Sequence, residues 1–347
     1  MKTMKTAVFH GVKKLVIEDA PYPEVPENKI LIRVEACALC TWEQRVYTGV
    51  KEVDFPFIGG HEIAGKIVDI GDKVDKRAWA IGDKVVHGTF GSCGNCYHCK
   101  TGNEQNCLHF DHSKHLEGLP YKGMGGLTQY MLADPKHLFK YKNISPEEAA
   151  LTEPLSAVIH SVETADIQFG DTVVVIGCGI MGQLHINLAL KRGAIVIASD
   201  MNEERTALAK KLGAHYTINP SKEELKKVVM KVTDGIGAQA VFNTTPIDSV
   251  VQEGIDALGN TAKLVLYSSF YPDNPVAFSP DTLHKKATQI LGTANSNSKD
   301  FMKATKMMSE GIVDVKPFIS EVYDLKDIVK AFDSSIKGDK YRVVIRF

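Results

Sequence analysis

A glycine-rich turn constrains this chain more than any other segment of its sequence. Gly177, Gly179 and Gly182 form the pattern G-x-G-x-x-G, which follows the apolar run DTVVVI and opens a helical run. Gly177 permits a tight turn, Gly179 removes the side chain that would block a pyrophosphate, and Gly182 lets the helix pack closely on the strand. The amides of Ile180 and Met181 at the helix start attract phosphate groups. The turn predicts a dinucleotide site, although a strand–helix turn can also need glycine without binding a ligand.

An acidic residue at the end of the next strand supports the dinucleotide interpretation. Asp200 follows Gly182 by 18 residues, as such a site requires. A carboxylate accepts hydrogen bonds from both hydroxyls of the adenosine ribose but repels a 2′-phosphate, which favours NAD over NADP. The alternative for Asp200 is an ordinary exposed acid at a strand end. Arg205 either flanks the adenine or is a solvated helix charge.

Strands and helices alternate from Gly170 to Gly292. Apolar runs such as DTVVVIG, AIVIASD, QAVFNTT and AKLVLYSS are separated by helical runs such as GIMGQLHINLALKRG, NEERTALAKKLGA and SKEELKKVVMKVTDG. Strands that are buried on both faces and separated by helices predict a doubly wound parallel sheet.

The first part of the chain has a different sequence pattern. Residues 1–145 alternate short β-type runs, such as KILIRVEA and EIAGKIVDIG, with turns rich in glycine and proline. This rhythm predicts a mostly antiparallel β-domain. Ser145 then opens a helical run, with Pro146 in the first turn and Glu148 in the position of a capping box.

These two sequence patterns, in a chain of 347 residues, predict an α/β protein with two domains. We expect the β-domain to cover residues 1–154 and to carry the metal sites described below. The parallel-sheet domain is expected over residues 155–290. Residues 291–347, with the helical run KDFMKATKMMSEG and the strand YRVVIRF, are expected to return to the first domain.

The charge balance and the absence of long apolar runs limit the partners that the sequence suggests. With 41 basic and 42 acidic side chains the net charge is −1, which provides no basic footprint for nucleic acid. No run approaches the ~18 apolar residues of a membrane span, and the opening residues lack the apolar region of a secretory signal. We expect a cytoplasmic protein that acts on a small molecule, with no nucleic-acid or membrane partner.

Four of the seven cysteines form a compact cluster with the spacing C-x2-C-x2-C-x7-C. Four thiolates at such spacing can close a tetrahedral shell around one zinc ion, and a closed shell implies a structural role. The alternatives are reduced surface thiols or a redox sensor. The members of the cluster are Cys93, Cys96, Cys99 and Cys107.

A second set of potential ligands is dispersed along the first domain. It consists of Cys40, His61, Glu62 and Glu153. Catalytic zinc typically takes three ligands of mixed cysteine, histidine and carboxylate type and keeps one position open. Each residue alone also has an ordinary explanation: a buried cysteine, a core histidine or a surface acid.

The run GHEIAGKIVDIGDKV, residues 60–74, resembles the zinc-containing alcohol dehydrogenase signature G-H-E-x2-G-x5-G-x2-V at every fixed position. The runs IGDKVV, CGNCYHCKTGNEQNC, GGLTQYM, LTEPLSAVIH, VVVIGCGIMG and IVDVKPFI follow in the order of that family. The likeness covers nearly the whole chain. Around Glu153 the sequence is most similar to the polyol branch (sorbitol, xylitol and butanediol dehydrogenases) and to threonine dehydrogenase.

The resemblance implies a GroES-like β-domain that includes the C-terminal segment, with a Rossmann domain between its two parts. It implies catalytic zinc on Cys40, His61 and either Glu62 or Glu153, structural zinc on the four clustered cysteines, and a homo-oligomer, either a tetramer or a dimer. In such enzymes zinc lowers the pKa of an alcohol, whose carbon gives hydride to the nicotinamide. The remaining carboxylate, on Glu153 or Glu62, holds water or takes part in proton transfer.

The sequence departs from the family just after the zinc cysteine. The family usually has C-G-[ST]-D, but residues 40–45 here are CTWEQR. Trp42 occupies the place of the hydroxyl that usually relays the alcohol proton, and Arg45 that of a histidine. We hypothesise that Thr41, Glu43, Glu153 or bound water takes over the relay.

The same departure bears on the substrate pocket. The flat face of Trp42 suits the C–H side of a sugar or polyol, and Arg45 suits a phosphate or carboxylate. The alternatives are that Trp42 only packs in the core and that Arg45 meets Glu43 or solvent.

The favoured function is an NAD-dependent zinc dehydrogenase for a secondary alcohol of a polyol, sugar or sugar derivative. A second hypothesis is an enzyme that keeps NAD bound and uses transient oxidation of its substrate, as an epimerase or lyase does. A third is a zinc-stabilised NAD-binding sensor.

Overall fold

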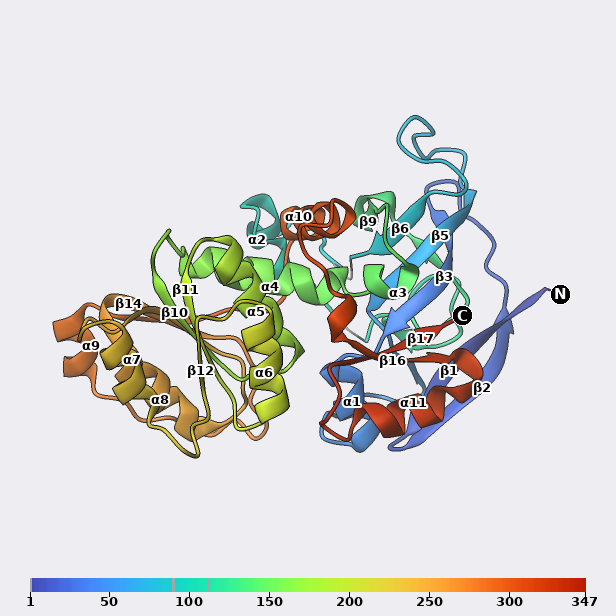
Figure 1. Cartoon of the computed structure of the whole chain (residues 1–347). Coiled ribbons are helices and arrows are strands. Elements are labelled where there is room, and N and C mark those ends of the chain that lie inside the picture. The colour runs from blue at the N-terminus through green and yellow to red at the C-terminus, as the bar shows by residue number, and fades with distance from the viewer. Residues whose placement is uncertain (1, 89–90, 112) are drawn as a thin grey trace. The chain divides into compact units, whose positions relative to one another are not determined.

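The computed structural model describes all residues except 1, 89–90 and 112 (Figure 1). It divides the chain into two compact units. Unit 1 contains the residues up to Ser156 together with Ser296–Phe347, and unit 2 contains Ala157–Asn295. The sequence placed these changes at 154/155 and 290/291.

Unit 2 is built on a six-stranded parallel sheet with the order β12-β11-β10-β13-β14-β15. All five residues of β10 are buried, as expected for a strand that is covered on both faces. The predicted doubly wound sheet is therefore confirmed. Its strands are β10 (Thr172–Ile176), β11 (Ile195–Ser199), β12 (Tyr216–Ile218), β13 (Ala238–Asn243), β14 (Leu258–Leu266) and β15 (Gln289–Gly292).

Helices connect the strands of this sheet, as the alternating pattern predicts. The helix expected over the run SKEELKKVVMKVTDG is shorter in the structure, because its first residues form a turn after Pro220. The helices are α5 (Ile180–Lys191), α6 (Glu203–Lys211), α7 (Leu225–Val232), α8 (Asp248–Ala257) and α9 (Pro280–Lys286).

Unit 1 contains two sheets that are mostly antiparallel. The larger has the order β16-β17-β3-β5-β6-β9, with β8 on β3, and the smaller has the order β2-β1-β4-β7. Only the pairs β16–β17 and β4–β7 are parallel among the described strands of unit 1. The strands are β1 (Thr3–Gly11), β2 (Lys14–Pro21), β3 (Ile30–Ala38), β4 (Phe57–Ile58), β5 (Glu62–Ile70), β6 (Lys84–His87), β7 (Lys122–Gly123), β8 (Tyr130–Ala133), β9 (Leu138–Lys140), β16 (Ile319–Asp324) and β17 (Arg342–Arg346).

The late segments of the chain complete unit 1. Strand β17 pairs antiparallel with β3, with Val344 opposite Ala38. Helix α11 packs Phe332 against Phe9 and Tyr47, with ring centroids 5.4 and 5.0 Å apart. The helices of unit 1 are α1 (Thr41–Thr48), α2 (Tyr97–Lys100), α3 (Pro146–Ala149), α10 (Ser298–Ser309) and α11 (Ile328–Ser335), with short 3-10 turns at Glu104–Asn106, Pro135–His137, Lys316–Phe318 and Leu325–Asp327.

The predicted capping box at Ser145 is confirmed. The Ser145 hydroxyl accepts a hydrogen bond from the Glu148 amide, and the Glu148 carboxylate accepts one from the Ser145 amide. The helical run that follows is broken near Ala150 into α3 and α4 (Thr152–Ala165). The break places Glu153 in the first turn of α4.

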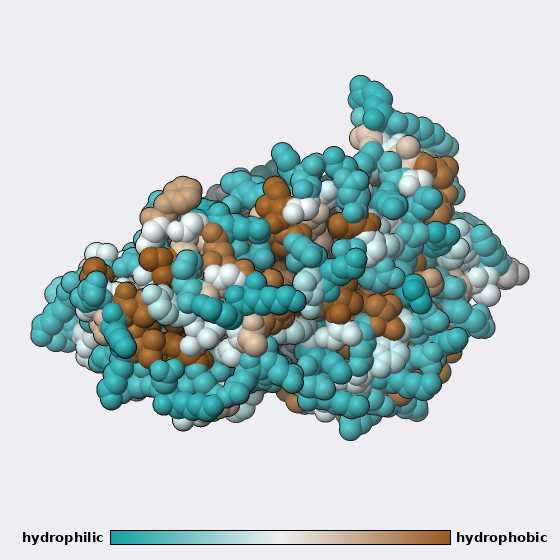
Figure 2. Space-filling view, in the orientation of Figure 1, coloured by the Kyte–Doolittle hydropathy of each residue, from teal (hydrophilic) through white to brown (hydrophobic). Residues whose placement is uncertain are grey.

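The surface of the molecule carries both hydrophilic and hydrophobic residues. Figure 2 shows hydrophilic residues over most of the visible face, with hydrophobic residues in smaller areas between them. Among the described residues, no helix has both the length and the apolar character needed to cross a membrane.

A buried histidine in unit 2 predicts a loss of stability in acid. His185 on α5 is fully buried; its Nδ1 donates to the Met181 carbonyl at 2.8 Å, and its Nε2 lies 2.9 Å from the Ser161 hydroxyl. Burial lowers the pKa of His185 from 6.5 to about 4. The unfolded chain therefore binds a proton at a higher pH than the folded chain, so the free energy of unfolding falls as the pH drops from 6.5 towards 4, by roughly 3 kcal/mol for this group.

Urea denaturation at pH 7.5, 6 and 4.5 measures this effect. H185Q should show a weaker pH dependence than the parent protein, whereas H284Q, which removes an exposed histidine of the same unit, should not. An equal pH dependence in the parent protein and H185Q would contradict the prediction.

Candidate active site and metal centres

The structure brings together three residues of the dispersed set. One potential ligand atom from each of Cys40, His61 and Glu62 lies within 4.8 Å of the others. Cys40 is the N-cap of α1, two residues after the end of β3, and Glu62 begins β5. Gly60 has φ +91°, and a Cβ there would lie 2.8 Å from the backbone of the 126–127 segment. Glycine is therefore required beside His61 for this approach.

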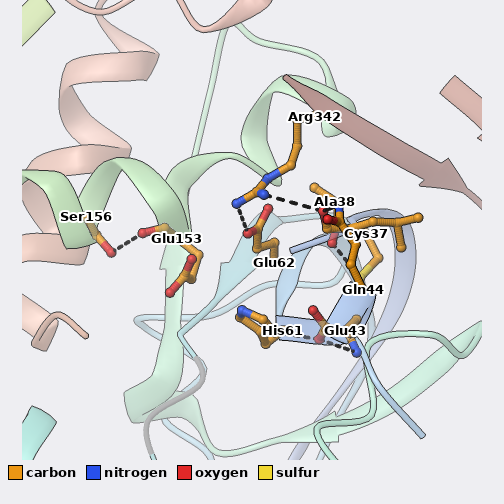
Figure 3. A network of polar contacts seen from close by, with 11 residues as sticks. Cys37, Ala38, Glu43, Gln44, His61, Glu62, Glu153, Ser156 and Arg342 are labelled. Atoms are coloured by element: carbon orange, nitrogen blue, oxygen red, sulfur yellow. Dashed lines mark hydrogen bonds and ion pairs between the residues drawn. The ribbon is translucent and has the colours of Figure 1, made fainter. Parts of the chain in front are cut away.

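A buried carboxylate orients the histidine. Glu43 is 1% exposed, and its Oε1 accepts a hydrogen bond from the Gly60 amide at 3.0 Å (Figure 3). The same oxygen lies 2.6 Å from His61 Nδ1. With Nδ1 bound to Glu43, the ring nitrogen that a metal would take is Nε2. Glu43, which the sequence suggested as a proton relay, thus contacts the ring nitrogen of His61 that would not bind the metal.

A buried arginine balances the charge of Glu62. Arg342 on β17 forms an ion pair with Glu62 Oε1 and donates from Nη1 to the Leu39 carbonyl at 3.4 Å (Figure 3). The two side chains are 3% and 0% exposed. Within the described part of the chain, Glu62 Oε2 is buried and has no hydrogen-bond partner. An unsatisfied carboxylate oxygen beside a thiol and an imidazole fits a zinc ion.

Burial and neighbouring charges shift the pKa values in this group. Burial disfavours the imidazolium of His61, but the Glu43 carboxylate and Cys40 raise its pKa well above the ordinary value. Burial raises the pKa of Glu62, which Arg342 partly offsets. Burial also raises the pKa of Glu153 to about 7, while His61 lowers it.

Glu153 lies next to the three-residue group but is not part of it. Its side chain extends from the start of α4 towards His61 and Glu62 (Figure 3). Its backbone carbonyl accepts a hydrogen bond from the Ser156 hydroxyl at 2.6 Å. Of the two carboxylates considered as ligands, the structure groups Glu62 with Cys40 and His61.

The four clustered cysteines also come together. One sulfur from each lies within 4.8 Å of the others, with Sγ–Sγ distances of 4.0 Å for Cys93–Cys99, 3.5 Å for Cys96–Cys99 and 3.9 Å for Cys96–Cys107. A tetrahedral shell with Zn–S bonds of ~2.3 Å requires about 3.8 Å between sulfurs. The amide of Cys96 donates to Cys93 Sγ at 3.3 Å, and that of His109 donates to Cys107 Sγ at 3.4 Å. Such donors stabilise thiolates, so the cluster fits a closed zinc shell.

The glycine-rich turn has the geometry that a dinucleotide needs. Gly177 has φ +90°, and a Cβ on Gly182 would lie 1.7 Å from the Gly177 carbonyl oxygen. A Cβ on Gly179 would meet nothing within 4 Å, so this side of the turn is open. Gly179 is the N-cap of α5, whose first residues are Ile180 and Met181.

Asp200 is tied to this turn by hydrogen bonds. Its Oδ2 accepts from the Cys178 amide at 2.7 Å, and its Oδ1 accepts from the Asn202 amide at 2.8 Å. The backbone carbonyl of Arg205 accepts from Gln183 Nε2 at 2.8 Å, which ties the start of α6 to α5. The acid predicted to read the ribose thus lies at the turn predicted to hold the pyrophosphate.

Comparison with known proteins decides the family. Residues 26–143 match the alcohol dehydrogenase GroES-like domain, and residues 181–310 match the zinc-binding dehydrogenase domain. The chain is 31% identical to erythritol/L-threitol dehydrogenase of Mycolicibacterium smegmatis, over 96% of this chain and 95% of that one. The chain belongs to the zinc-type medium-chain dehydrogenase family.

A second relative and a solved structure support the same family. The dehydrogenase is 28% identical to D-arabitol-phosphate dehydrogenase of Enterococcus avium, over 99% of this chain and 97% of that one. A crystal structure of a zinc-binding dehydrogenase from Sinorhizobium meliloti bound to NADP has the same fold, with a TM-score of 0.89, 23% identity and full coverage of both chains. The protein is a zinc-dependent dehydrogenase of the alcohol or polyol type.

The residues that depart from the family lie on α1 of this dehydrogenase. Thr41 is exposed at the start of the helix, whereas Trp42 and Arg45 are half-buried. The Trp42 ring lies edge-on to the His61 ring, with centroids 6.5 Å apart. Sequence reasoning missed Arg342; its only signal there is a charged residue at the start of the apolar run RVVIR.

Breaking the cysteine cluster of this dehydrogenase should release one metal ion and destabilise mainly the segment that carries the cluster, residues 91–111, which we call the cysteine lobe. In C99S, three thiolates remain and the shell opens, so the zinc content should fall by about one ion per chain. Because residues 91–111 contribute no strand to either sheet of unit 1, we expect the free energy of unfolding to fall by only about 2 kcal/mol. Zinc analysis and limited proteolysis of residues 91–111 measure this. H109Q, which removes an exposed histidine of the same lobe, is the control, and full zinc retention in C99S would contradict the assignment.

Proposed function

We propose that this dehydrogenase oxidises a secondary alcohol of a polyol, sugar or sugar derivative with NAD, using one catalytic and one structural zinc ion. The observation that carries the proposal is the close grouping of Cys40, His61 and the buried Glu62, in which Glu62 Oε2 has no hydrogen-bond partner among the described residues. Erythritol/L-threitol and D-arabitol-phosphate dehydrogenases, which share this family, support the substrate class.

A zinc ion held by Cys40, His61 and Glu62 would supply Lewis-acid chemistry at the alcohol oxygen. Glu43 keeps the His61 ring in one orientation through the contact with Nδ1. Arg342 favours the charged form of the Glu62 carboxylate and holds it in place inside the core. The chain thus holds both residues before a substrate binds.

Glu153 is our candidate for proton transfer. Trp42 has no hydroxyl, and the Oε1 atom of Glu43 already bonds to Gly60 and lies against His61. Glu153 is a half-buried carboxyl group whose pKa is shifted by the nearby His61 and Glu62, and Thr41 remains a second candidate at the exposed start of α1.

Asp200 is proposed to select NAD over NADP. In D200N the negative charge is removed but a hydrogen-bond acceptor remains for the Cys178 amide. Because the repulsion of a 2′-phosphate is lost, the ratio of kcat/KM with NAD to that with NADP should fall about tenfold or more. E204Q, which removes an exposed acid on α6, should leave this ratio unchanged. An unaltered ratio in D200N would assign cofactor choice to other residues.

The two units are proposed to divide this work, with the zinc sites in unit 1 and NAD bound to unit 2. We also propose a cytoplasmic location, which the sequence composition suggests, and a dimer or tetramer, which the family resemblance implies.

The test is NADH formation by zinc-loaded protein over matched alcohols. The set contains neutral polyols and sugars, their phosphates, sugar acids, threonine and 2,3-butanediol. Turnover that peaks on a polyol or a sugar derivative supports the proposal, and a peak on threonine overturns its substrate class. Product formation without net NADH would favour the alternative in which bound NAD is only transiently reduced.

A further inference from the structure

Two histidines of unit 1 line a cavity of about 300 Å³ and belong to neither group of metal ligands described above. His87 ends β6, and His137 lies in the 3-10 turn Pro135–His137 between β8 and β9. Strand β6 pairs with β9, with His87 opposite Leu138, and the Gly88 amide donates to the His137 carbonyl at 2.8 Å. The fold thus sets the two rings beside each other, with centroids 6.1 Å apart and planes inclined at 87°.

One ring nitrogen of each histidine is buried without a partner. Within the part of the chain that the structure describes, neither His87 Nδ1 nor His137 Nε2 has a hydrogen bond. Buried polar atoms are normally paired, so two such atoms in one cavity point to a missing ligand or ion. Both nitrogens are almost inaccessible to water. A metal ion approaches a nitrogen to about 2.1 Å, closer than a hydrogen-bonded water at about 2.9 Å, so an ion fits where a water does not.

The surroundings keep both rings neutral and orient one of them. Burial lowers the pKa of His87 from 6.5 to about 3 and that of His137 from 6.5 to about 4. A neutral imidazole is the form that binds metal ions. Asp134 Oδ2 lies 4.0 Å from His137 Nδ1, and Asp134 Oδ1 accepts a hydrogen bond from Lys29 Nζ at 2.8 Å. The carboxylate thus faces Nδ1 of His137, which leaves Nε2 for another ligand.

The separation of the two rings suits a single ion between them. With metal–nitrogen bonds of ~2.1 Å, an ion lies about 3.2 Å from each ring centroid, so the centroids are about 5.2 Å apart at a tetrahedral angle and about 6.4 Å apart when the rings are opposite each other. The observed 6.1 Å lies within this range. Among the described residues, no third histidine, cysteine or carboxylate forms a close group with this pair. The remaining positions of an ion are therefore left to water from the cavity.

We propose that His87 Nδ1 and His137 Nε2 bind a further transition-metal ion of the zinc type, which joins the end of β6 to the turn between β8 and β9. Imidazole is a suitable ligand for such ions. Neither histidine belongs to the group around Cys40 or to the four clustered cysteines, so the site is additional to the two zinc sites. The inference goes beyond the proposed function and does not depend on it.

Equilibrium dialysis of the zinc-loaded protein measures this site. The protein is first dialysed without added zinc, the ions that it retains are counted, and it is then titrated with Zn²⁺. One further ion per chain should bind saturably at micromolar free Zn²⁺. H87Q and H137Q should each weaken this binding about tenfold or more. H10Q, which removes a histidine of the same unit that already pairs with Glu18, should not alter it.

Thermal unfolding provides the second measurement. Because the ion binds to the folded chain, the Tm of the parent protein and of H10Q should rise by about 5 °C when free Zn²⁺ is raised to about a hundred times the Kd of the further ion. H87Q and H137Q should lose most of this rise, whatever the substitution itself does to the Tm without added zinc.

The outcomes separate this site from the others. Absence of a further ion up to millimolar Zn²⁺ would overturn the inference, and so would a further ion that H87Q and H137Q bind as the parent protein does. Variants that keep the ions counted before the titration are folded, so their loss of the further ion is a loss of its ligands. None of these measurements requires alcohol oxidation, so a failure of the proposed function would leave them unchanged.

Discussion

Replacing Cys40 by serine should lower kcat/KM about a thousandfold or more and release about one zinc ion per chain. Serine cannot supply a thiolate, so the group that contains His61 and Glu62 loses its soft ligand. Loss of the ion removes several kcal/mol of stabilisation at the alcohol oxygen, and each 1.36 kcal/mol corresponds to about a tenfold change in rate. Zinc analysis and initial rates on the same preparation measure both effects.

The controls separate ligand loss from general damage. C37A alters another buried thiol of the same region and should keep both zinc ions, with a modest loss of stability. E43Q leaves the three ligands in place but weakens the contact with His61 Nδ1, so it should lower zinc affinity about tenfold to a hundredfold. A C40S enzyme with full zinc content and normal rates would contradict the ligand assignment.

Removing Arg342 should destabilise unit 1 by about 3–5 kcal/mol, because a buried carboxylate loses its partner. In R342M the apolar part of the side chain is retained, so the loss comes from the Glu62 charge and not from a cavity. Urea denaturation at pH 7 measures this effect on stability.

R346M is the matched control for this prediction. Arg346 lies on the same strand, is 57% exposed and pairs with Asp324 at 3.1 Å. An exposed ion pair contributes only about 0–1 kcal/mol, so R346M should be nearly as stable as the parent protein. Equal stabilities of R342M and R346M would mean that Glu62 is neutral or otherwise satisfied in the fold.

The features that the sequence predicted correctly are those with local signals. The order of strands and helices in unit 2 follows from apolar runs and glycine positions, and the capping box at Ser145 follows from residues three positions apart. The four cysteines lie within one short segment, so their spacing alone brings them together.

The features that were missed depend on partners distant in the sequence. Arg342 and Glu62 are 280 residues apart, and nothing in either segment specifies the other. The approach of His87 to His137 depends on the pairing of β6 with β9, which the pattern of residue types does not reveal. Glu43 was recognised as an acid near the site, but only the fold shows that it lies against His61 Nδ1.

The position of Arg342 also sets an order of events during synthesis of the chain. At about 5–20 residues per second, the ribosome adds Arg342 roughly 14–56 s after Glu62. Throughout that interval Glu62 lacks Arg342, its buried ion-pair partner in the folded unit, whereas all of unit 2 is translated before β17. Unit 2 can therefore fold while the chain is still being made. Unit 1, with the ligands Cys40, His61 and Glu62, can be completed only after β17 has been translated.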